Sequence, residues 1–259
     1  MRNLIDLAAA AWRHAGVRPV TFQLISAIGV VGRYAVDSDN MEIPEHRVPM
    51  AAALPLGYCE AKWICERLLD QTLHRQPARF RAMVVRPGQI ARSRENGYWN
   101  PTEHFAFLVK SCQSLQVLPA LQGRLQWVPV EDVAATVVEL GLREGTVYPV
   151  YHVDNPVGQP WDAMLQTLAL ELGISEIVPL RDCVRRVRHS PLSMETENPA
   201  LRLIDFLADN FERMSCGGLV PGTTQTRQHS VTLAALGPVP EELARKYVRA
   251  WKRSGFLAC

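Results

Sequence analysis

Hydrophobic residues in the first third of the chain follow two alternating patterns, one amphipathic and one continuously apolar. An alanine-rich amphipathic run predicts a helix from Asn3 to His14, and a second helix is predicted to start near Gly57. Continuous apolar runs predict strands at Val20 to Ser26 and at Arg81 to Val85. Apolar strands that alternate with helices are typical of a parallel sheet covered on both faces.

Glycine and polar residues mark the breaks between these elements. Gly16 is expected to end the first helix, and Gly29 and Gly32 bracket a turn after the first strand. A polar loop is predicted through Asp37 and Asn40. The second helix carries its apolar residues on one face: Ala61, Ile64, Cys65, Leu68 and Leu69.

The second half of the chain has a less regular pattern. Three short strands and two helices are predicted there: strands at Gln126 to Val130, Val147 to Val153 and Ile177 to Leu180, and helices at Glu131 to Leu142 and Trp161 to Leu172. Helices then dominate to the end. One exception is the stretch from Ser215 to Gly237, whose glycine, threonine and proline residues predict a loop.

Composition narrows the class of protein. With 259 residues, 47% of them hydrophobic, the chain can bury a sizeable core. The formal net charge of +2 is too small to indicate a nucleic-acid partner. No apolar run is long enough for a membrane span and no signal peptide is recognisable, so we expect a cytoplasmic protein without membrane partners. The six scattered cysteines are expected to be reduced, and no metal site is predicted.

The sharpest chemical signal is the pair Tyr58 and Lys62 at the start of the second helix. Their spacing of four puts both side chains on one helical face. A lysine ammonium beside a phenol favours the phenolate, so we expect the pKa of Tyr58 to be lowered from its ordinary value of about 10. Such a tyrosine can pass a proton to a carbonyl oxygen as a hydride reaches the carbon.

Other residues carry weaker signals. Glu60 and Glu66, on the same helix as Tyr58, are predicted to face solvent. The basic run from Arg181 to His189 is interpreted as a solvated face in preference to a docking site for an acidic carrier protein. Four tryptophans are predicted to fill a core or line a substrate cleft: Trp63, Trp99, Trp127 and Trp161.

Six stretches, taken in chain order, match the motifs of one known family. They are Phe22 to Gly32, Gly57 to Trp63, Val85 to Ile90, Gly97 to Asn100, Trp127 to Ala135 and Tyr151 to Pro156. The first looks like a strand that ends in a Ser-Ser or Ser-Thr pair, and the second resembles an active-site helix. The chain therefore resembles the extended short-chain dehydrogenase/reductases, most of all the thioester-reductase domains that end fungal polyketide and peptide synthetases.

The resemblance implies an α/β fold, with a Rossmann-like parallel sheet that lacks its first strands and a mostly helical C-terminal substrate lobe. It places a partial Rossmann-like catalytic region in residues 1–125 and the substrate-binding lobe in residues 126–259. The implied reaction is NADPH-dependent reduction of a thioester held by an acyl or peptidyl carrier protein. The product would be an aldehyde or, after a second reduction, an alcohol.

The resemblance also implies roles for individual residues. Tyr58 would be the proton donor, Lys62 its activator and a contact of the cofactor ribose, and Ser26 the third catalytic residue. The nicotinamide end of the cofactor site would be bordered by Pro87, Gly88, Gln89 and Ile90.

Two features depart from the family. Ala27 stands where the family has the serine or threonine that holds the substrate oxygen, and Ser26 points to the opposite face of the strand unless the register slips. Loss of one such donor typically costs about 10²–10³ in rate. The chain also lacks the Gly-x-Gly-x-x-Gly turn that holds a dinucleotide pyrophosphate, since the stretch from Gly29 to Gly32 does not have its form.

Three functions stay open from the sequence. The first is a reductase whose cofactor is held unusually or whose missing half comes from another chain. The second is a non-redox cyclase or hydrolase that acts on a carrier-bound chain, with Tyr58 as general acid. The third is an inactive remnant or partner of a synthetase. The open edge of the strand at Val20 to Ser26 also predicts a homodimer, a partner that completes the sheet, or cover by the first helix.

Overall fold

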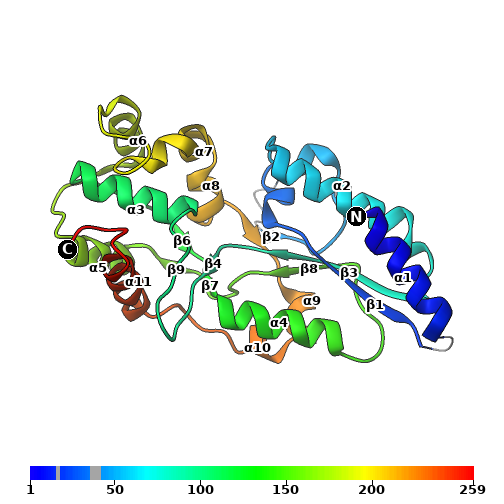
Figure 1. Ribbon diagram of the computed structural model, residues 1–259. Coiled ribbons are helices and arrows are strands. Elements are labelled where there is room, and N and C mark those ends of the chain that lie inside the picture. Colours follow the sequence, from blue (N-terminus) through cyan, green and yellow to red (C-terminus); the bar gives the residue numbers. More distant parts are fainter. Residues whose placement is uncertain (16–17, 36–41) are drawn as a thin grey trace. The chain divides into compact units, whose positions relative to one another are not determined.

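The computed structural model describes residues 1–15, 18–35 and 42–259. The helix end predicted at Gly16, and the polar loop through Asp37 and Asn40, lie outside the described residues. Two compact units are present, and each is made of three separate stretches of chain (Figure 1). The first comprises Met1–Gln89, Asp132–Pro156 and Leu219–Gly237, and the second Ile90–Glu131, Val157–Gly218 and Pro238–Cys259. The expected division into functional regions at residue 125 stays a prediction.

The first unit is built on a three-stranded parallel sheet, in the order β1 (Val20–Ile25), β3 (Phe80–Pro87) and β8 (Val150–Val153). The continuous apolar runs that predicted these strands correspond to side chains buried on both faces in β3 and β8. By contrast, β1 lies at the edge and is only partly buried, because β3 is its one paired neighbour among the described residues. The expected α/β fold with a parallel sheet is confirmed.

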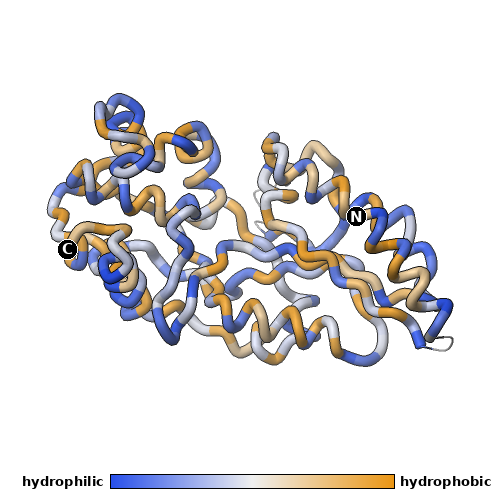
Figure 2. The backbone as a smooth tube through the Cα atoms, viewed as in Figure 1, coloured by the Kyte–Doolittle hydropathy of each residue, from blue (hydrophilic) through white to orange (hydrophobic). Residues whose placement is uncertain are grey.

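Helices cover both faces of this sheet. On one face, α1 (Arg2–Ala15) and α2 (Gly57–Gln71) pack through Ala8 and Leu69 against the apolar side chains of β1 and β3. On the other face, Gln23 Nε2 of β1 donates to the carbonyl oxygen of Val137 at 3.0 Å, in α4 (Val130–Leu142). Hydrophobic and hydrophilic residues alternate around α1 and α2, as expected of amphipathic helices (Figure 2).

Short elements complete the first unit. They are β2 (Glu42–Ile43), β11 (Val220–Pro221), α9 (Thr224–His229), α10 (Val231–Ala234) and the 3₁₀ turns η1 (Ile28–Val31), η2 (Met50–Ala52) and η3 (Leu73–Arg75). The loop predicted from Ser215 to Gly237 is therefore wrong, since it contains β11, α9 and α10. Side-chain hydrogen bonds give this segment its structure. Thr226 in α9 donates to the buried Glu45 carboxylate, and Ser230 caps α10 by accepting from the backbone N–H of Leu233 at 3.1 Å.

The second unit is mostly helical. Its helices are α3 (His104–Leu115), α5 (Asp162–Leu172), α6 (Leu180–His189), η4 (Pro199–Leu203), α7 (Ile204–Asp209), α8 (Phe211–Ser215) and α11 (Glu241–Arg253). Three two-stranded ladders accompany them: β4 (Ile90–Ala91) with β7 (Val128–Pro129), β5 (Leu118–Ala120) with β10 (Ile177–Pro179), and β6 (Arg124–Leu125) with β9 (Gln159–Pro160). Trp99, Trp127 and Trp161 are buried in its core, as predicted.

Two further expectations concern the whole chain. All six cysteines are free thiols, and four of them are buried. Among the residues that the structure describes, no helix combines the length and the apolar character that a membrane crossing requires.

Candidate functional site

Tyr58 and Lys62 lie one turn apart at the start of α2 and beside the carboxyl end of β1. Lys62 Nζ lies 5.6 Å from the centroid of the Tyr58 ring and donates to the carbonyl oxygen of Ile25 at 2.8 Å. The Tyr58 side chain is 62% exposed, so the phenol can be reached from solvent. Ligands of open α/β sheets bind at this carboxyl edge.

The pKa of Tyr58 is raised above its ordinary value, first because partial burial disfavours the phenolate and second because of the neighbouring Cys59. The lowered pKa expected from the Lys62 spacing is therefore wrong. The geometry explains the difference, since the Lys62 ammonium lies over the ring and gives a hydrogen bond to Ile25. At neutral pH, Tyr58 consequently carries its proton.

Ser26 follows directly on β1, and its side chain is only 3% exposed. Its hydroxyl donates to Glu66 Oε1 at 2.6 Å. Glu66 also accepts two hydrogen bonds from Arg86, at 2.9 Å from Nε to Oε1 and 2.6 Å from Nη2 to Oε2. The prediction that Glu66 faces solvent is therefore wrong, because the residue is 5% exposed and pairs with a fully buried arginine.

Sequence reasoning missed Glu66 and Arg86, although two signals were present. Glu66 continues the spacing of four from Tyr58 and Lys62. Arg86 follows the buried apolar run from Ala82 to Val85 in β3, and a buried guanidinium needs a buried carboxylate partner.

A second layer of hydrogen bonds surrounds Arg86. Its Nη1 donates to the carbonyl oxygen of His46 at 3.1 Å and lies 3.3 Å from Nε2 of His152. The pKa of His152 is lowered to about 3, mainly because the ring is buried and also because Arg86 is close. The neutral ring accepts from Arg86 on Nε2 and donates from Nδ1 to the carbonyl oxygen of Gly222 at 3.0 Å.

The segment expected to border the nicotinamide begins at the same edge of the sheet. Pro87 ends β3, and the backbone N–H of Gly88 donates to the carbonyl oxygen of Val153 at 2.9 Å. A Cβ on Gly88 would lie 2.4 Å from Oδ1 of the buried Asp154, so a larger residue here would have to displace that side chain. Gln89 ends that stretch of the first unit, while Ile90 belongs to the second.

The space around Gly29 and Gly32, which follow β1, shows whether this segment could hold the pyrophosphate of a dinucleotide. A Cβ on Gly29 would lie 2.5 Å from Cys59 Sγ, and one on Gly32 would lie 2.4 Å from Leu54 Cγ. Both glycines therefore serve close packing inside the protein and leave no open backbone cradle for a phosphate. In the part of the chain that the structure describes, the turn from Gly29 to Gly32 therefore does not fit the pyrophosphate of a dinucleotide. The expected roles of Tyr58 and Lys62 at the nicotinamide and ribose end stay a prediction.

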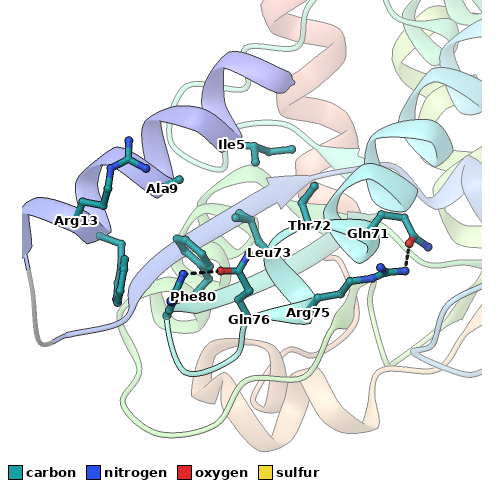
Figure 3. A pocket seen from close by; sticks show the side chains of 11 residues that line it. Ile5, Ala9, Arg13, Gln71, Thr72, Leu73, Arg75, Gln76 and Phe80 are labelled. Atoms are coloured by element: carbon teal, nitrogen blue, oxygen red, sulfur yellow. Dashed lines mark hydrogen bonds between the residues drawn. The ribbon is translucent and has the colours of Figure 1, made fainter.

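A separate cavity of about 370 Å³ lies between α1 and η3, at the amino end of β3 (Figure 3). Ile5 and Phe80 contribute apolar surface to it, and Arg13 and Arg79 contribute charge. The Arg79 guanidinium lies 4.3 Å from the Trp12 ring centroid. Because Tyr58 lies at the opposite, carboxyl end of the strands, this cavity is not part of the candidate site.

Two further sequence signals concern metals and the basic run. In residues 1–15, 18–35 and 42–259, no three His, Cys, Asp or Glu side chains are grouped so as to hold a metal ion. The basic run forms α6, whose Val184 and Val187 are buried while Arg186 gives two hydrogen bonds to Glu176, at 2.8 and 2.6 Å. Its role in docking a carrier stays a prediction.

Comparison with known proteins places these residues in a family context. Residues 2–137 match the profile of an NAD-binding family described as male sterility protein. The chain is 57% identical over 264 residues to the iterative polyketide synthase afoE of Emericella nidulans, and 54% identical over 268 residues to a non-reducing polyketide synthase of Aspergillus terreus. These alignments cover 99% of this chain but 9% and 10% of the two synthases, so the chain spans about a tenth of the length of these curated relatives.

Solved structures share the fold. The terminal R domain from the myxalamid PKS-NRPS biosynthetic pathway superimposes with a TM-score of 0.73 at 22% identity, over 92% of this chain and 60% of that one. A thiolation-reductase di-domain from an archaeal non-ribosomal peptide synthetase gives a TM-score of 0.71 at 18% identity, over 96% and 52%. At these identities the likeness establishes a common Rossmann-like fold.

Proposed function

This chain belongs to the NAD-binding family described as male sterility protein, and we propose that it supplies the proton-donating part of a thioester reductase. The observation that carries the proposal is the pair Tyr58 and Lys62, placed together at the carboxyl edge of a parallel sheet. The similarity to fungal polyketide synthases supports a thioester held by an acyl or peptidyl carrier protein as the substrate.

Reduction of a thioester to an aldehyde and a thiol consumes one hydride and one proton. Tyr58 is placed to give the proton, because its phenol is exposed and its raised pKa keeps it protonated at neutral pH. The Lys62 ammonium, 5.6 Å from the ring centroid, then stabilises the phenolate that is left. Its hydrogen bond to Ile25 holds the ammonium at this distance from the ring.

The hydride donor of our proposal is NADPH, and its pyrophosphate must be held by a segment that these residues do not supply. The fold comparison supports this division, because about two fifths of the myxalamid R-domain chain has no counterpart here. We expect calorimetric titration of the 259-residue chain with NADPH to show no binding at micromolar concentrations. Micromolar binding would contradict the division and point to a reductase that works alone.

The reaction itself can be tested by exchange of homologous segments. The 264 aligned residues of the Emericella nidulans synthase would be replaced by this chain, and aldehyde release would be measured with and without NADPH. We expect NADPH-dependent release, and a loss of about 10²-fold or more in the Tyr58→Phe variant. Release of the same aldehyde by Tyr58→Phe at an unchanged rate would contradict the proposed role.

One observation favours a non-redox alternative. A protonated Tyr58 beside residues that do not fit a pyrophosphate is also suited to general acid catalysis by a cyclase or hydrolase acting on a carrier-bound chain. Product release by the exchanged synthase separates the reductase from the non-redox enzyme. Only the non-redox enzyme releases product without NADPH. If no product forms under either condition, the chain is an inactive partner of a synthetase.

A further inference from the structure

One face of α2 is tied to the carboxyl ends of two strands. Glu66 follows Lys62 by four residues, as Lys62 follows Tyr58, so the three side chains line one face of the helix. Lys62 donates to Ile25, the last residue of β1, and Glu66 accepts from the next residue, Ser26. Arg86, in β3, donates two hydrogen bonds to the same carboxylate.

This contact adds a directional constraint on α2 to the apolar packing of the helix. A guanidinium that gives two parallel hydrogen bonds to a carboxylate has a narrow range of geometry. Glu66 and Arg86 are both more than nine-tenths buried, so a shift of the helix would leave a charge in the interior without its partner.

We propose that Glu66 is a positioning residue, which sets the Tyr58 phenol against the carboxyl edge of the sheet through its bonds to Ser26 and Arg86. Ser26 contributes to the same positioning of α2. Its single hydroxyl hydrogen is given to Glu66 and its side chain is buried, so it acts on α2 and does not touch the substrate. The catalytic consequence rests on the proposed function, whereas the effect on Tyr58 is independent of it.

The test compares Glu66→Gln and Ser26→Ala with a matched control on the same helix, Glu60→Gln, whose side chain is partly exposed. In the first measurement, the 259-residue chain carries ¹³C-labelled tyrosine, and the Tyr58 ring signal is assigned with Tyr58→Phe and titrated with pH. In the second, kcat and KM for aldehyde release are measured in the exchanged synthase.

We expect Glu66→Gln to shift the Tyr58 signal and to lower its titration midpoint toward the ordinary value of about 10, because a displaced phenol loses its partial burial. Ser26→Ala removes one bond only and should give a smaller shift in the same direction, with no further shift in the double variant. In the synthase, kcat should fall about 10²-fold in Glu66→Gln with KM little changed. Glu60→Gln should match the wild type.

Two results would overturn the proposal. One is a folded Glu66→Gln or Ser26→Ala protein whose Tyr58 signal and midpoint equal those of the wild type. The other is a loss of about 10²–10³ in kcat for Ser26→Ala with an unchanged Tyr58 signal, which would identify Ser26 as a donor to the substrate. Failure of the proposed function would abolish release in every variant and leave the Tyr58 titrations to decide the positioning role.

Discussion

Asp70, near the end of α2, gathers three basic side chains around one carboxylate. It accepts hydrogen bonds from Arg47 Nε at 2.6 Å, Arg67 Nη1 at 2.9 Å and His74 Nδ1 at 2.7 Å. Burial by itself would raise the pKa of this carboxyl, but the bonds from His74 and Arg47 together outweigh burial and lower it. The folded state therefore holds the ionised form more firmly than the unfolded chain does.

A lowered carboxyl pKa gives a stabilisation that is complete above the unfolded value of about 3.9 and is lost as the pH falls through the folded value. We expect Asp70→Asn to reduce the free energy of unfolding at pH 7 by roughly 1–3 kcal/mol, with a smaller difference at pH 3. Urea unfolding at both pH values measures this, and Asp6→Asn, in an exposed pair with Arg2, is the control. A difference that does not change with pH would mean that packing, not charge, is responsible.

At the scale of elements, the turn η1 lies close to α2 at Gly29, which has no side chain. A Cβ at this position would lie 2.5 Å from Sγ of Cys59, which is buried next to Tyr58. We expect Gly29→Ala to lower the free energy of unfolding by about 1–3 kcal/mol through overpacking. Thermal unfolding measures the change, and Gly29→Ala with Cys59→Ala should recover part of it.

Gly57 provides the matched control for this prediction. It starts α2, and a Cβ there would meet no atom within 4 Å. Gly57→Ala should therefore unfold like the wild type or at slightly higher temperature, because alanine favours the helix. Equal stability of the Gly29→Ala protein would show that Cys59 can move aside and that the contact between η1 and α2 is loose.

The sequence predicts elements better than it predicts their partners. Periodicity locates α1, α2, β1 and β3 because each repeats a local pattern, and the spacing of Tyr58 and Lys62 is local in the same sense. The role of Glu66 depends on Arg86, 20 residues away, and that pairing exists only once β3 lies beside α2. The capped segments around Thr226 resemble a loop because Ser and Thr favour turns and caps alike.

At the scale of the whole molecule, the first unit carries apolar surface beside an open sheet edge. Ile64 and Leu68 on α2 are 49% and 41% exposed, and Leu4 and Leu7 on α1 are more exposed still. Among the described residues, β1 pairs with β3 alone, so its other edge has no neighbouring strand. The sequence predicts an apolar face on α2, and part of that face is exposed in the structure. The hydrophobic pattern alone does not tell which molecule covers it.

Unpaired edges recruit other strands, and apolar patches of this kind favour association. We therefore expect light scattering on the purified chain to give a mass of a dimer or larger, or a complex with the polypeptide that completes the sheet. Ile64→Glu with Leu68→Glu should shift the chain toward monomer while circular dichroism stays unchanged, because both side chains are already half exposed. A stable monomer of the wild-type chain with a cooperative melt would contradict this, and would mean that α1 alone gives the sheet sufficient cover.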